Sequence, residues 1–424
     1  MNFFKQIFQS QTARITSLNS ISVILKVTIG LITSKLLAVF VGPSGLALIG
    51  NLRNFISSLE NVAALGFQNG VVKYVAENEK DQTQISKIMT SVFAVLFVLA
   101  VLLSSILFGF SDYFNQKIFG NNTNYLFVIK ALALALPFYT ISTFFLAFIN
   151  GLGKYRNVIL TNIAGNIIGL VASVLLIYEY KTFGALLSIV ITPALLFIFT
   201  YYYLNKEINI IKSISSKNFD FEIIKKMSSF SLMALVSAVF GPIILFAIRQ
   251  EIIASYGLEQ AGFWESMSRI SSNYLMFVTT ILTIYFLPRL IKANTNQDTK
   301  IVFRDYFKYI LTLFTIGAIF IYFSRDYIIK ILFTEKFMQI SNLFFWQLIG
   351  DVFKVASLIL GYQFFAKRLT KAYIIFEIFG LLLLYFASII FLKLNGLEGV
   401  IFAQALENFV YFIVLIIYFR KILF

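Results

Sequence analysis

Long apolar segments follow one another from end to end of this 424-residue chain, and they constrain its fold more than any other feature. A helix needs about 20 mostly apolar residues to cross the hydrocarbon core of a membrane. Twelve windows of this kind, each bounded by charged or turn-forming residues, can be placed along the sequence. We therefore expect an all-α integral membrane protein with twelve transmembrane helices. The predicted spans are residues 17–41, 45–72, 86–110, 124–152, 157–179, 183–204, 229–255, 261–288, 303–323, 338–364, 372–393 and 398–419.

The amino-acid composition excludes an ordinary water-soluble protein. Hydrophobic residues make up 59% of the chain and charged residues 13%, which is about half the charged share of a typical soluble domain. The opening segment "MNFFKQIFQSQTAR" is polar and basic, and the apolar stretch after it is too long for a signal-peptide core, so we expect no cleaved signal. Cysteine and histidine are absent. We therefore expect no disulfide, no metal and no bound cofactor, and any H⁺ or Na⁺ would have to be carried by carboxylates.

The distribution of Lys and Arg residues predicts the orientation in the membrane. An even number of spans places both termini on one side, which then collects 21 Lys and Arg residues in its loops against 6 on the other side. Basic loops remain in the cytoplasm, so we expect both termini to be cytoplasmic. The net charge of +15 then reflects membrane topology, and nucleic acid is not expected as a partner.

Two separate segments of the chain match later segments at one spacing, 215 residues. The segment "LLAVFVG", which ends at Gly42, matches "EIIASYG", which ends at Gly257, and "RNVILTNIAG" matches "KAYIIFEIFG". The longest predicted loop, about residues 205–228, lies between the two copies. We predict an N-lobe of six helices in residues 1–210 and a C-lobe of six helices in residues 211–424. Repeats of this type bind their substrate between the lobes and work by rocking one lobe against the other.

Basic side chains inside the predicted spans are the first candidates for function, because a charge at the bilayer centre costs about 3 kcal/mol. Lys26 lies deep in the first span. Lys35, nine residues later, lies on the opposite face of a straight helix, so it joins Lys26 only if the helix bends at Gly30; otherwise it reaches the outer headgroups. Lys130 and Arg249 are also deep and have no obvious local partner. These bases predict a cationic cavity that binds an anionic ligand.

Other charged side chains inside the spans have a neighbour of opposite sign. Arg53 and Glu60 are seven residues apart and share a helix face, so two interpretations stay open: part of a binding site, or an ion pair that fixes the helix. Glu265 and Arg269 are spaced i, i+4, and we expect them to pair with each other rather than with a substrate.

The tenth span carries a polar stripe formed by Gln347, Asp351, Lys354 and Ser357. Such a stripe faces either a cavity or a partner helix, and the mutual neutralisation of Asp351 and Lys354 is compatible with both. Small and amide residues in the fifth span predict close helix packing with hydrogen bonds. They are Asn162, Gly165, Asn166 and Gly169.

Four segments, "SKLLAVFVGPSGLALIGNLRNF", "GFQNGVVKYVAE", "FSLMALVSAVFGPI" and "FWQLIGDVFKV", resemble the polysaccharide transporters of the MOP superfamily, and among them the Wzx-type O-antigen translocases. The resemblance covers nearly the whole chain. It implies a V-shaped pair of six-helix lobes in the bacterial inner membrane. It also implies flipping of an undecaprenyl-pyrophosphate-linked oligosaccharide, such as an O-antigen or common-antigen repeat unit, from the cytoplasmic to the periplasmic leaflet.

The same resemblance assigns expected roles to individual residues. The positions expected to bind the substrate are Lys26, Lys35, Arg53, Lys130, Arg249, Asp351 and Lys354. Glu60, Glu265 and Arg269 depart from the family pattern, and we expect them to tune specificity or coupling to H⁺ or Na⁺. Expected partners are the lipid-linked oligosaccharide, membrane lipids and other membrane proteins of polysaccharide assembly.

Two alternative functions are weighed against this one. A MATE-like multidrug exporter coupled to a cation would need an acid-dominated cavity, and the excess of deep bases argues against it. A membrane enzyme, such as a polymerase or a lipid-linked glycosyltransferase, would need a large extramembrane loop or a nucleotide-sugar site. Neither is evident in the sequence, so we expect a transporter rather than an enzyme.

Overall fold

Helices make up the secondary structure of the computed structural model, which describes residues 11–120, 122–293 and 295–423. No β-strand occurs within these ranges, so the all-α prediction is confirmed for them. Lys5, one of the basic residues assigned to the cytoplasmic side, lies outside them. Eight helical stretches are long and apolar enough to cross a membrane. The chain is a multi-pass membrane protein.

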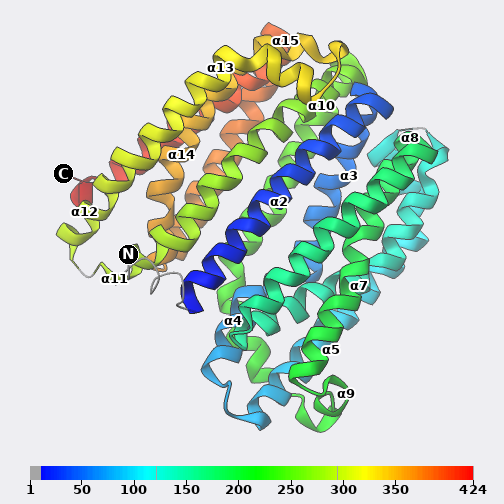
Figure 1. The fold of residues 1–424 in the computed structure, drawn as a ribbon, viewed down its shortest axis with the longest axis vertical. Helices are drawn as coiled ribbons and strands as arrows, with labels where there is room; N and C mark the ends of the chain where they lie inside the picture. The colour runs from blue at the N-terminus through cyan, green and yellow to red at the C-terminus, as the bar shows by residue number, and fades with distance from the viewer. Residues whose placement is uncertain (1–10, 121, 294, 424) are drawn as a thin grey trace. The chain divides into compact units, whose positions relative to one another are not determined.

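Figure 1 shows the helices in chain order, from blue at the N-terminus to red at the C-terminus. Those in the first half are α2 (Gln11–Phe40), α3 (Gly42–Ala63), α4 (Gln68–Glu77), α5 (Gln82–Gly109), α6 (Ser111–Phe119), α7 (Leu126–Gly151), α8 (Tyr155–Glu207) and α9 (Ile210–Ser213). Those that follow are α10 (Phe221–Ile281), α11 (Leu287–Lys292), α12 (Asn296–Tyr306), α13 (Thr312–Leu332), α14 (Phe344–Ala366) and α15 (Thr370–Leu423). Short 3₁₀ turns are η1 (Thr123–Tyr125), η2 (Ser216–Asn218) and η5 (Glu335–Leu343), and π-helical turns are η3 (Leu282–Phe286) and η4 (Phe307–Leu311).

Helix α8 is a hairpin whose backbone reverses at Lys181, where φ is 49° and ψ is −121°. The two ends of the hairpin meet, because Nζ of Lys154, just before the helix, lies 2.8 Å from Oε2 of Glu207 at its end. The predicted spans 157–179 and 183–204 therefore correspond to the two arms of this hairpin.

Helices α10 and α15 reverse in the same way. The break in α10 is at Gly257, with a φ of 87°, and that in α15 is at Gly396, with a φ of 61°. Glycine adopts such left-handed angles without the steric penalty of a Cβ atom. The hydroxyl of Tyr256 donates a hydrogen bond of 3.1 Å to the carbonyl oxygen of Leu392, so the two reversals are joined to each other.

The second predicted span, residues 45–72, is not one continuous helix. It is divided into α3 and α4 by a turn in which Leu65 and Gly66 have φ angles of 50° and 62°. A left-handed conformation ends an α-helix locally. The hydropathy of the segment did not predict this break, because hydropathy does not depend on backbone angles.

Positive φ angles recur along the chain at a constant spacing. Three residues of the first half each have a counterpart 215 residues later that also adopts a positive φ angle. The pairs are Gly42 (74°) with Gly257 (87°), Gly153 (70°) with Arg368 (55°), and Lys181 (49°) with Gly396 (61°). The start of α8 at Tyr155 and the start of α15 at Thr370 have the same spacing. This register of backbone turns supports the duplication predicted from the sequence.

The chain is divided into two compact units. The N-terminal unit comprises Met1–Thr33 and Asn51–Val239, and the C-terminal unit comprises Ser34–Gly50 and Phe240–Phe424. The predicted lobes, residues 1–210 and 211–424, stay a prediction. Each unit is described by itself.

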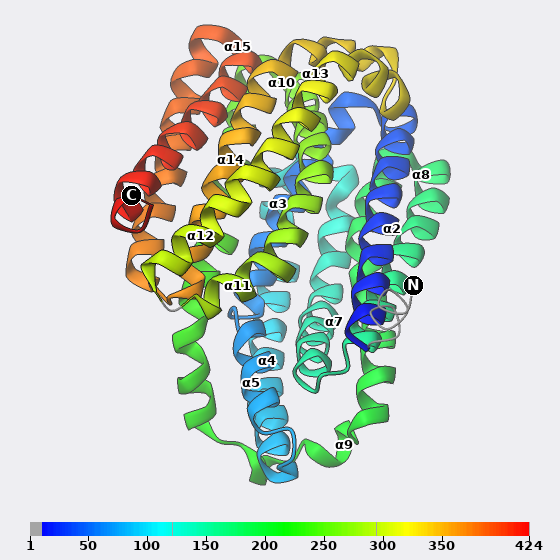
Figure 2. The ribbon, with the colours of Figure 1, turned by 60° about the vertical axis from the view of Figure 1, so that its left-hand side comes forward.

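Aromatic side chains of α7 fill the core of the N-terminal unit. Phe144, Phe145 and Phe148 are buried in one cluster with Met89 of α5 and Val75 of α4. Figures 1 and 2 both show α5 and α7 side by side, with α4 next to them. Apolar side chains of these helices thus hold the unit together.

Helix α14 is the central helix of the C-terminal unit, where it packs against α13 and α15 (Figure 2). The buried ring of Phe364 contacts the rings of Phe376, Tyr418 and Phe419 from α15, with centroid distances of 5.8, 5.8 and 5.1 Å. Aromatic pairs at such distances add to the stability gained by burial.

Candidate functional site in the N-terminal unit

A polar cavity of about 360 Å³ lies inside the N-terminal unit. Its walls come from α2, α3, α7 and both arms of α8. The lining residues are Ile29, Thr33, Arg53, Ile56, Ser57, Glu60, Tyr139, Gly165, Asn166, Gly169, Ser173, Ser188, Ile189, Thr192 and Pro193. The cavity therefore joins one basic and one acidic side chain with hydroxyl and amide groups.

Helix α3 supplies the charged wall of the cavity. Arg53 and Glu60 are two helical turns apart and both line it, so the predicted shared face is confirmed. Other residues of α3 fix the helix, because Ser58 and Asn61 donate hydrogen bonds of 3.2 Å to the carbonyl oxygens of Val239 and Ala238. The charged face is thereby held toward the cavity by bonds that do not involve the charged groups.

The carboxyl group of Glu60 is held by one hydrogen bond to the side chain of Tyr139. Its Oε1 atom is buried and has no hydrogen-bond partner among the residues that the structure describes. Burying a polar oxygen without a partner costs about 1–3 kcal/mol. A proton, a cation or a donor group of a bound molecule would supply the missing interaction.

Glycines bring the two arms of α8 close together behind the cavity. A Cβ atom on Gly165 would collide with Cδ2 of Leu196, and one on Gly169 would lie 2.9 Å from Cγ2 of Thr192. The predicted close packing of this helix is confirmed at both glycines. Asn166, which was assigned to the same packing, lines the cavity instead.

Lys26 lies on the face of α2 that reaches the cavity. It precedes the lining residues Ile29 and Thr33 by three and seven residues, which places the three side chains on one stripe of the helix. Its own side chain is exposed in the structure. Lys130 lies elsewhere in the unit, with its Nζ 5.8 Å from the centre of the Phe108 ring.

Lys35 has backbone partners within the C-terminal unit. Its ammonium group donates a hydrogen bond of 2.9 Å to the carbonyl oxygen of Lys330 and another to that of Phe333. These carbonyls belong to the end of α13, where backbone acceptors lack helical partners. Lys35 therefore stabilises a helix end, and the substrate contact expected of it stays a prediction.

Arg249, which has no local partner in the sequence, is paired with a more distant residue in the structure, and its role in substrate binding stays a prediction. Its Nη2 lies 2.8 Å from Oε2 of Glu265, and the two side chains are 2% and 0% exposed. Arg269 binds the other oxygen of Glu265 at 3.0 Å, as the i, i+4 spacing predicted. Trp264 covers the Arg249 guanidinium, 5.0 Å from the ring centre. The sequence did not reveal the partner of Arg249 because the reversal of α10 lies between the two residues.

Asp351 is the centre of a buried hydrogen-bond network in the C-terminal unit. Ser271 donates a bond of 2.7 Å to its Oδ2, Tyr274 donates a second bond to the same atom, and Nε2 of Gln347 lies 3.1 Å away. This network ties α14 to α10, which favours the packing interpretation for Asp351. Lys354, three residues later, is exposed.

Lys354 lies within electrostatic range of Glu377 and Glu407 as well as Asp351. In the 215-residue register Lys354 corresponds to Tyr139, and Glu407 corresponds to Thr192. Two residues that line the N-terminal cavity are thus replaced by a base and an acid in the second copy. At these two positions the C-terminal unit therefore carries Lys354 and Glu407 in place of the uncharged Tyr139 and Thr192.

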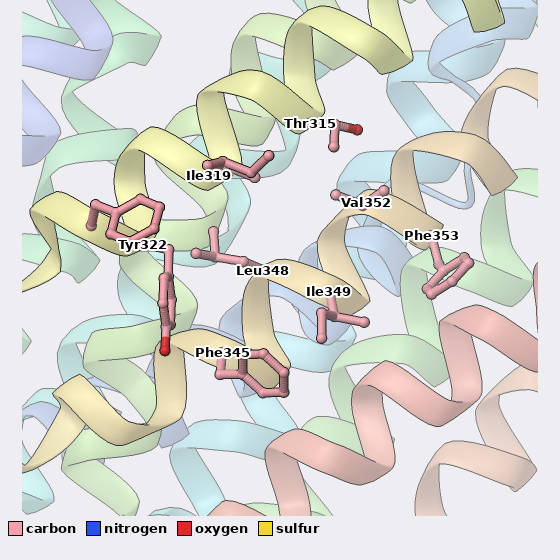
Figure 3. A pocket seen from close by; sticks show the side chains of 10 residues that line it. Thr315, Ile319, Tyr322, Phe345, Leu348, Ile349, Val352 and Phe353 are labelled. Atoms are coloured by element: carbon pink, nitrogen blue, oxygen red, sulfur yellow. The ribbon is translucent and has the colours of Figure 1, made fainter.

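An apolar groove of about 420 Å³ lies between α13 and α14 (Figure 3). Ile319, Tyr322, Phe345 and Leu348 are among the side chains that line it. The hydroxyl of Thr315, which also lines the groove, donates to the carbonyl oxygen of Leu311 at 2.8 Å. The groove consequently presents hydrocarbon, in contrast to the cavity of the N-terminal unit.

No group of three or more Asp, Glu, His or Cys residues is arranged to hold a metal ion in the described part of the chain. The hydroxyl-bearing cavity residues that the sequence did not single out are Thr33, Ser57, Tyr139, Ser173, Ser188 and Thr192. Hydroxyl groups are common in membrane helices, so their presence alone gave no signal. Only the fold shows that they surround one space.

Comparison with known proteins gives a consistent family relationship. Residues 13–294 match the family model described as "Polysaccharide biosynthesis protein". The chain is 31% identical over 392 residues to the Lipid III flippase of Escherichia coli (strain K12), which covers 92% of this chain and 94% of that protein. The Lipid III flippase of Shigella flexneri matches with the same identity and coverage.

Solved structures share the fold at low sequence identity. An inward-facing MATE family multidrug resistance transporter of the MOP superfamily superposes with a TM-score of 0.77 at 15% identity, covering 94% of this chain and 97% of that chain. An outward-facing structure of such a transporter gives a TM-score of 0.70 at 16% identity, covering 98% and 97%. A MOP superfamily transporter from Pyrococcus furiosus gives 0.64 at 14% identity, covering 98% and 97%.

Proposed function

Because the chain belongs to the polysaccharide biosynthesis protein family, we propose that it is a flippase that moves a lipid-linked oligosaccharide across the bacterial inner membrane. The observation that carries this proposal is the 31% identity over nearly the full length of both chains to proteins named for lipid flipping. The substrate we propose is an oligosaccharide on an undecaprenyl pyrophosphate, such as an O-antigen or common-antigen repeat unit. The chain is a transporter and not an enzyme.

The chemistry of such a substrate matches the cavity of the N-terminal unit. A pyrophosphate that crosses hydrocarbon without partners loses a hydration energy of tens of kcal/mol. Charge-assisted hydrogen bonds from Lys and Arg replace part of that hydration. We propose that Arg53 and Lys26 make these bonds, while Asn166 and the cavity hydroxyls bind neighbouring polar groups. Lys130 and Lys354 are secondary candidates outside this cavity.

The architecture that we propose is a pair of six-helix lobes with twelve spans. The three hairpins, α8, α10 and α15, each provide two spans, and α2, α3, α5, α7, α13 and α14 provide one each. Both termini are cytoplasmic in this arrangement, as the basic loops require. We propose that transport follows the alternating-access scheme of parallel-repeat transporters.

We propose that a buried carboxyl group carries the ion to which transport is coupled. Glu60 is our candidate, because its free Oε1 atom faces no protein donor among the described residues and its other contact is a neutral hydroxyl. H⁺ and Na⁺ both fit this chemistry. Asp351 is less suited, because Ser271, Tyr274 and Gln347 already bond its oxygens.

The experiment is complementation of a flippase-null strain, with surface glycan measured by antibody staining and protein abundance by immunoblot. We expect Lys26→Ala and Arg53→Ala each to lose most glycan display at normal abundance. Lys217→Ala, which removes an exposed positive charge from the loop of the same unit, is the matched control. Wild-type display by both cavity variants would reject the cationic site. Arg53→Lys and Lys26→Arg then separate net charge from guanidinium geometry.

A drug exporter of the MATE type is the second candidate. The likeness to MATE structures is at 14–16% identity and therefore carries the fold alone. Drug resistance conferred by the chain in a strain without exporters, together with failure to restore glycan display, would favour this alternative.

A further inference from the structure

A second hollow lies at the end of the C-terminal unit, where three chain reversals meet. The reversals at Gly257 and Gly396 are joined there by the hydrogen bond from Tyr256 to Leu392, and the turn η5 forms the third side. Two cavities of about 320 and 270 Å³ open at this place, and both are lined by Glu398. The two cavities therefore adjoin the same side chain, and together they are called the double cavity.

The double cavity is rich in uncommitted polar groups. Gln260, Gln339 and Asn342 line the first cavity, and Asn395 lines the second, with Glu398 between them. Within the described residues, none of these five side chains makes a hydrogen bond or an ion pair with the protein. Carboxamides both donate and accept hydrogen bonds, and a carboxylate accepts. Together they match a ligand with many hydroxyl groups.

Aromatic rings form the other wall of the second cavity. The ring of Trp346 lies 4.7 Å from that of Phe402, which in turn lies 4.8 Å from Phe391. The three rings therefore form a continuous apolar surface directly beside the polar side chains. Tryptophan offers a large apolar face together with one N–H donor, so this surface can receive the C–H face of a sugar ring.

The first copy of the repeat shows that the fold does not require polar side chains at these positions. Phe127 occupies the first-copy position that matches Asn342, 215 residues earlier, and Phe183 occupies the one that matches Glu398. The rings of Phe127 and Phe183 contact each other with a centroid distance of 6.2 Å. The matching positions of the first copy thus carry two apolar rings in place of an amide and a carboxylate.

We propose that this double cavity binds the carbohydrate part of the lipid-linked oligosaccharide. The proposal rests on the flippase function, and it assigns the glycan a site separate from the cavity with Arg53. The predicted span order places all three reversals on the side opposite the termini. The cavity then receives the glycan on the periplasmic side, after the headgroup has crossed.

The chain provides its own reporter for this test, because Trp346 and Trp264 are its two tryptophans. A Trp264→Phe variant in lipid nanodiscs leaves the emission of Trp346 alone. The probe is the oligosaccharide pool released by mild acid from the polyprenyl lipids of a flippase-null strain. We expect a saturable change in Trp346 emission when the oligosaccharides bind. The affinity should be at least tenfold weaker for Asn342→Phe and for Glu398→Phe, because each variant loses hydrogen bonds worth about 1.4 kcal/mol or more. Asn124→Ala, at the first-copy position of Gln339, should bind like the parent.

Two results would overturn the proposal: an unchanged Trp346 emission, or an equal response in the phenylalanine variants. The wild-type protein, in which the buried Trp264 adds a constant background, gives a second reading if Trp264→Phe is poorly produced. Complementation by the same proteins separates the two hypotheses. Restored glycan display without a sugar response rejects the glycan site and keeps the flippase function, whereas failure of the wild-type protein to restore display rejects the flippase function itself.

Discussion

The side chains of Glu60 and Tyr139 share a hydrogen bond in the wall of the N-terminal cavity. Glu60→Gln keeps an oxygen that accepts this bond but removes the ability to ionise. We expect Glu60→Gln to lower the rate of glycan display at least tenfold and to make the remainder insensitive to a protonophore or to Na⁺ removal. Tyr139→Phe, which costs about 1 kcal/mol of hydrogen bonding, should have a smaller effect. Coupled transport at the wild-type rate in Glu60→Gln would exclude Glu60 as the ion carrier.

Arg249 and Glu265 should behave as a structural pair. Removing one member of a buried pair and leaving the other charge uncompensated costs about 3–5 kcal/mol, and the cost here is a part of that, because Arg269 still binds Glu265. We expect Arg249→Leu to lower the thermal unfolding temperature in detergent strongly, and the double variant with Glu265→Leu to recover part of the loss. Arg249→Leu that is stable yet inactive would instead indicate direct substrate contact.

Gly50 should tolerate no side chain, because a Cβ atom there would lie 2.5 Å from Oε2 of Glu265 and 2.7 Å from Cζ of Arg249. We expect Gly50→Ala to destabilise the protein by about 1–3 kcal/mol, measured by thermal unfolding. Gly317→Ala is the matched control, since nothing lies within 4 Å of its Cβ position. In that helix alanine should be neutral or stabilising. Equal effects of the two substitutions would contradict the close approach.

Lys354 should act as the counter-charge of the acidic side chains around it. Lys354→Met leaves Glu377 and Glu407, which lie within electrostatic range of each other, without their nearby base. We expect severalfold lower glycan display, restored in part by adding Glu407→Gln. If Glu407→Gln brings no recovery, Lys354 has a role other than charge balance, and direct contact with the substrate becomes the better explanation.

Much of the helical layout could be predicted from hydropathy and charge. The gap between the fifth and sixth predicted spans contains Lys181, where α8 reverses, and Gly257 lies in the gap between the seventh and eighth. Helical periodicity likewise placed Arg53 and Glu60 on one face. These features depend on residues close in the sequence, which is the range that pattern analysis covers.

The pairing of charges could not be predicted where it depends on distant segments. Lys35 binds backbone carbonyls almost 300 residues away, and carbonyl groups carry no sequence signature. Arg249 meets Glu265 only because α10 folds back on itself. Tyr139 was missed because a single tyrosine among apolar residues is the usual composition of a membrane helix.

The paired left-handed turns differ in residue type between the two halves of the chain. At two of the three pairs one copy uses glycine and the other a long charged residue, Lys181 opposite Gly396 and Arg368 opposite Gly153. A non-glycine residue in this conformation costs about 1–2 kcal/mol. Each half therefore has a non-glycine residue at one of these turns, at a position where the other half has glycine, and both halves keep the turn itself. The two halves thus share backbone turns while their side chains differ: Tyr139 and Thr192 line the cavity of the N-terminal unit, and Lys354 and Glu407 occupy the matching positions of the C-terminal unit.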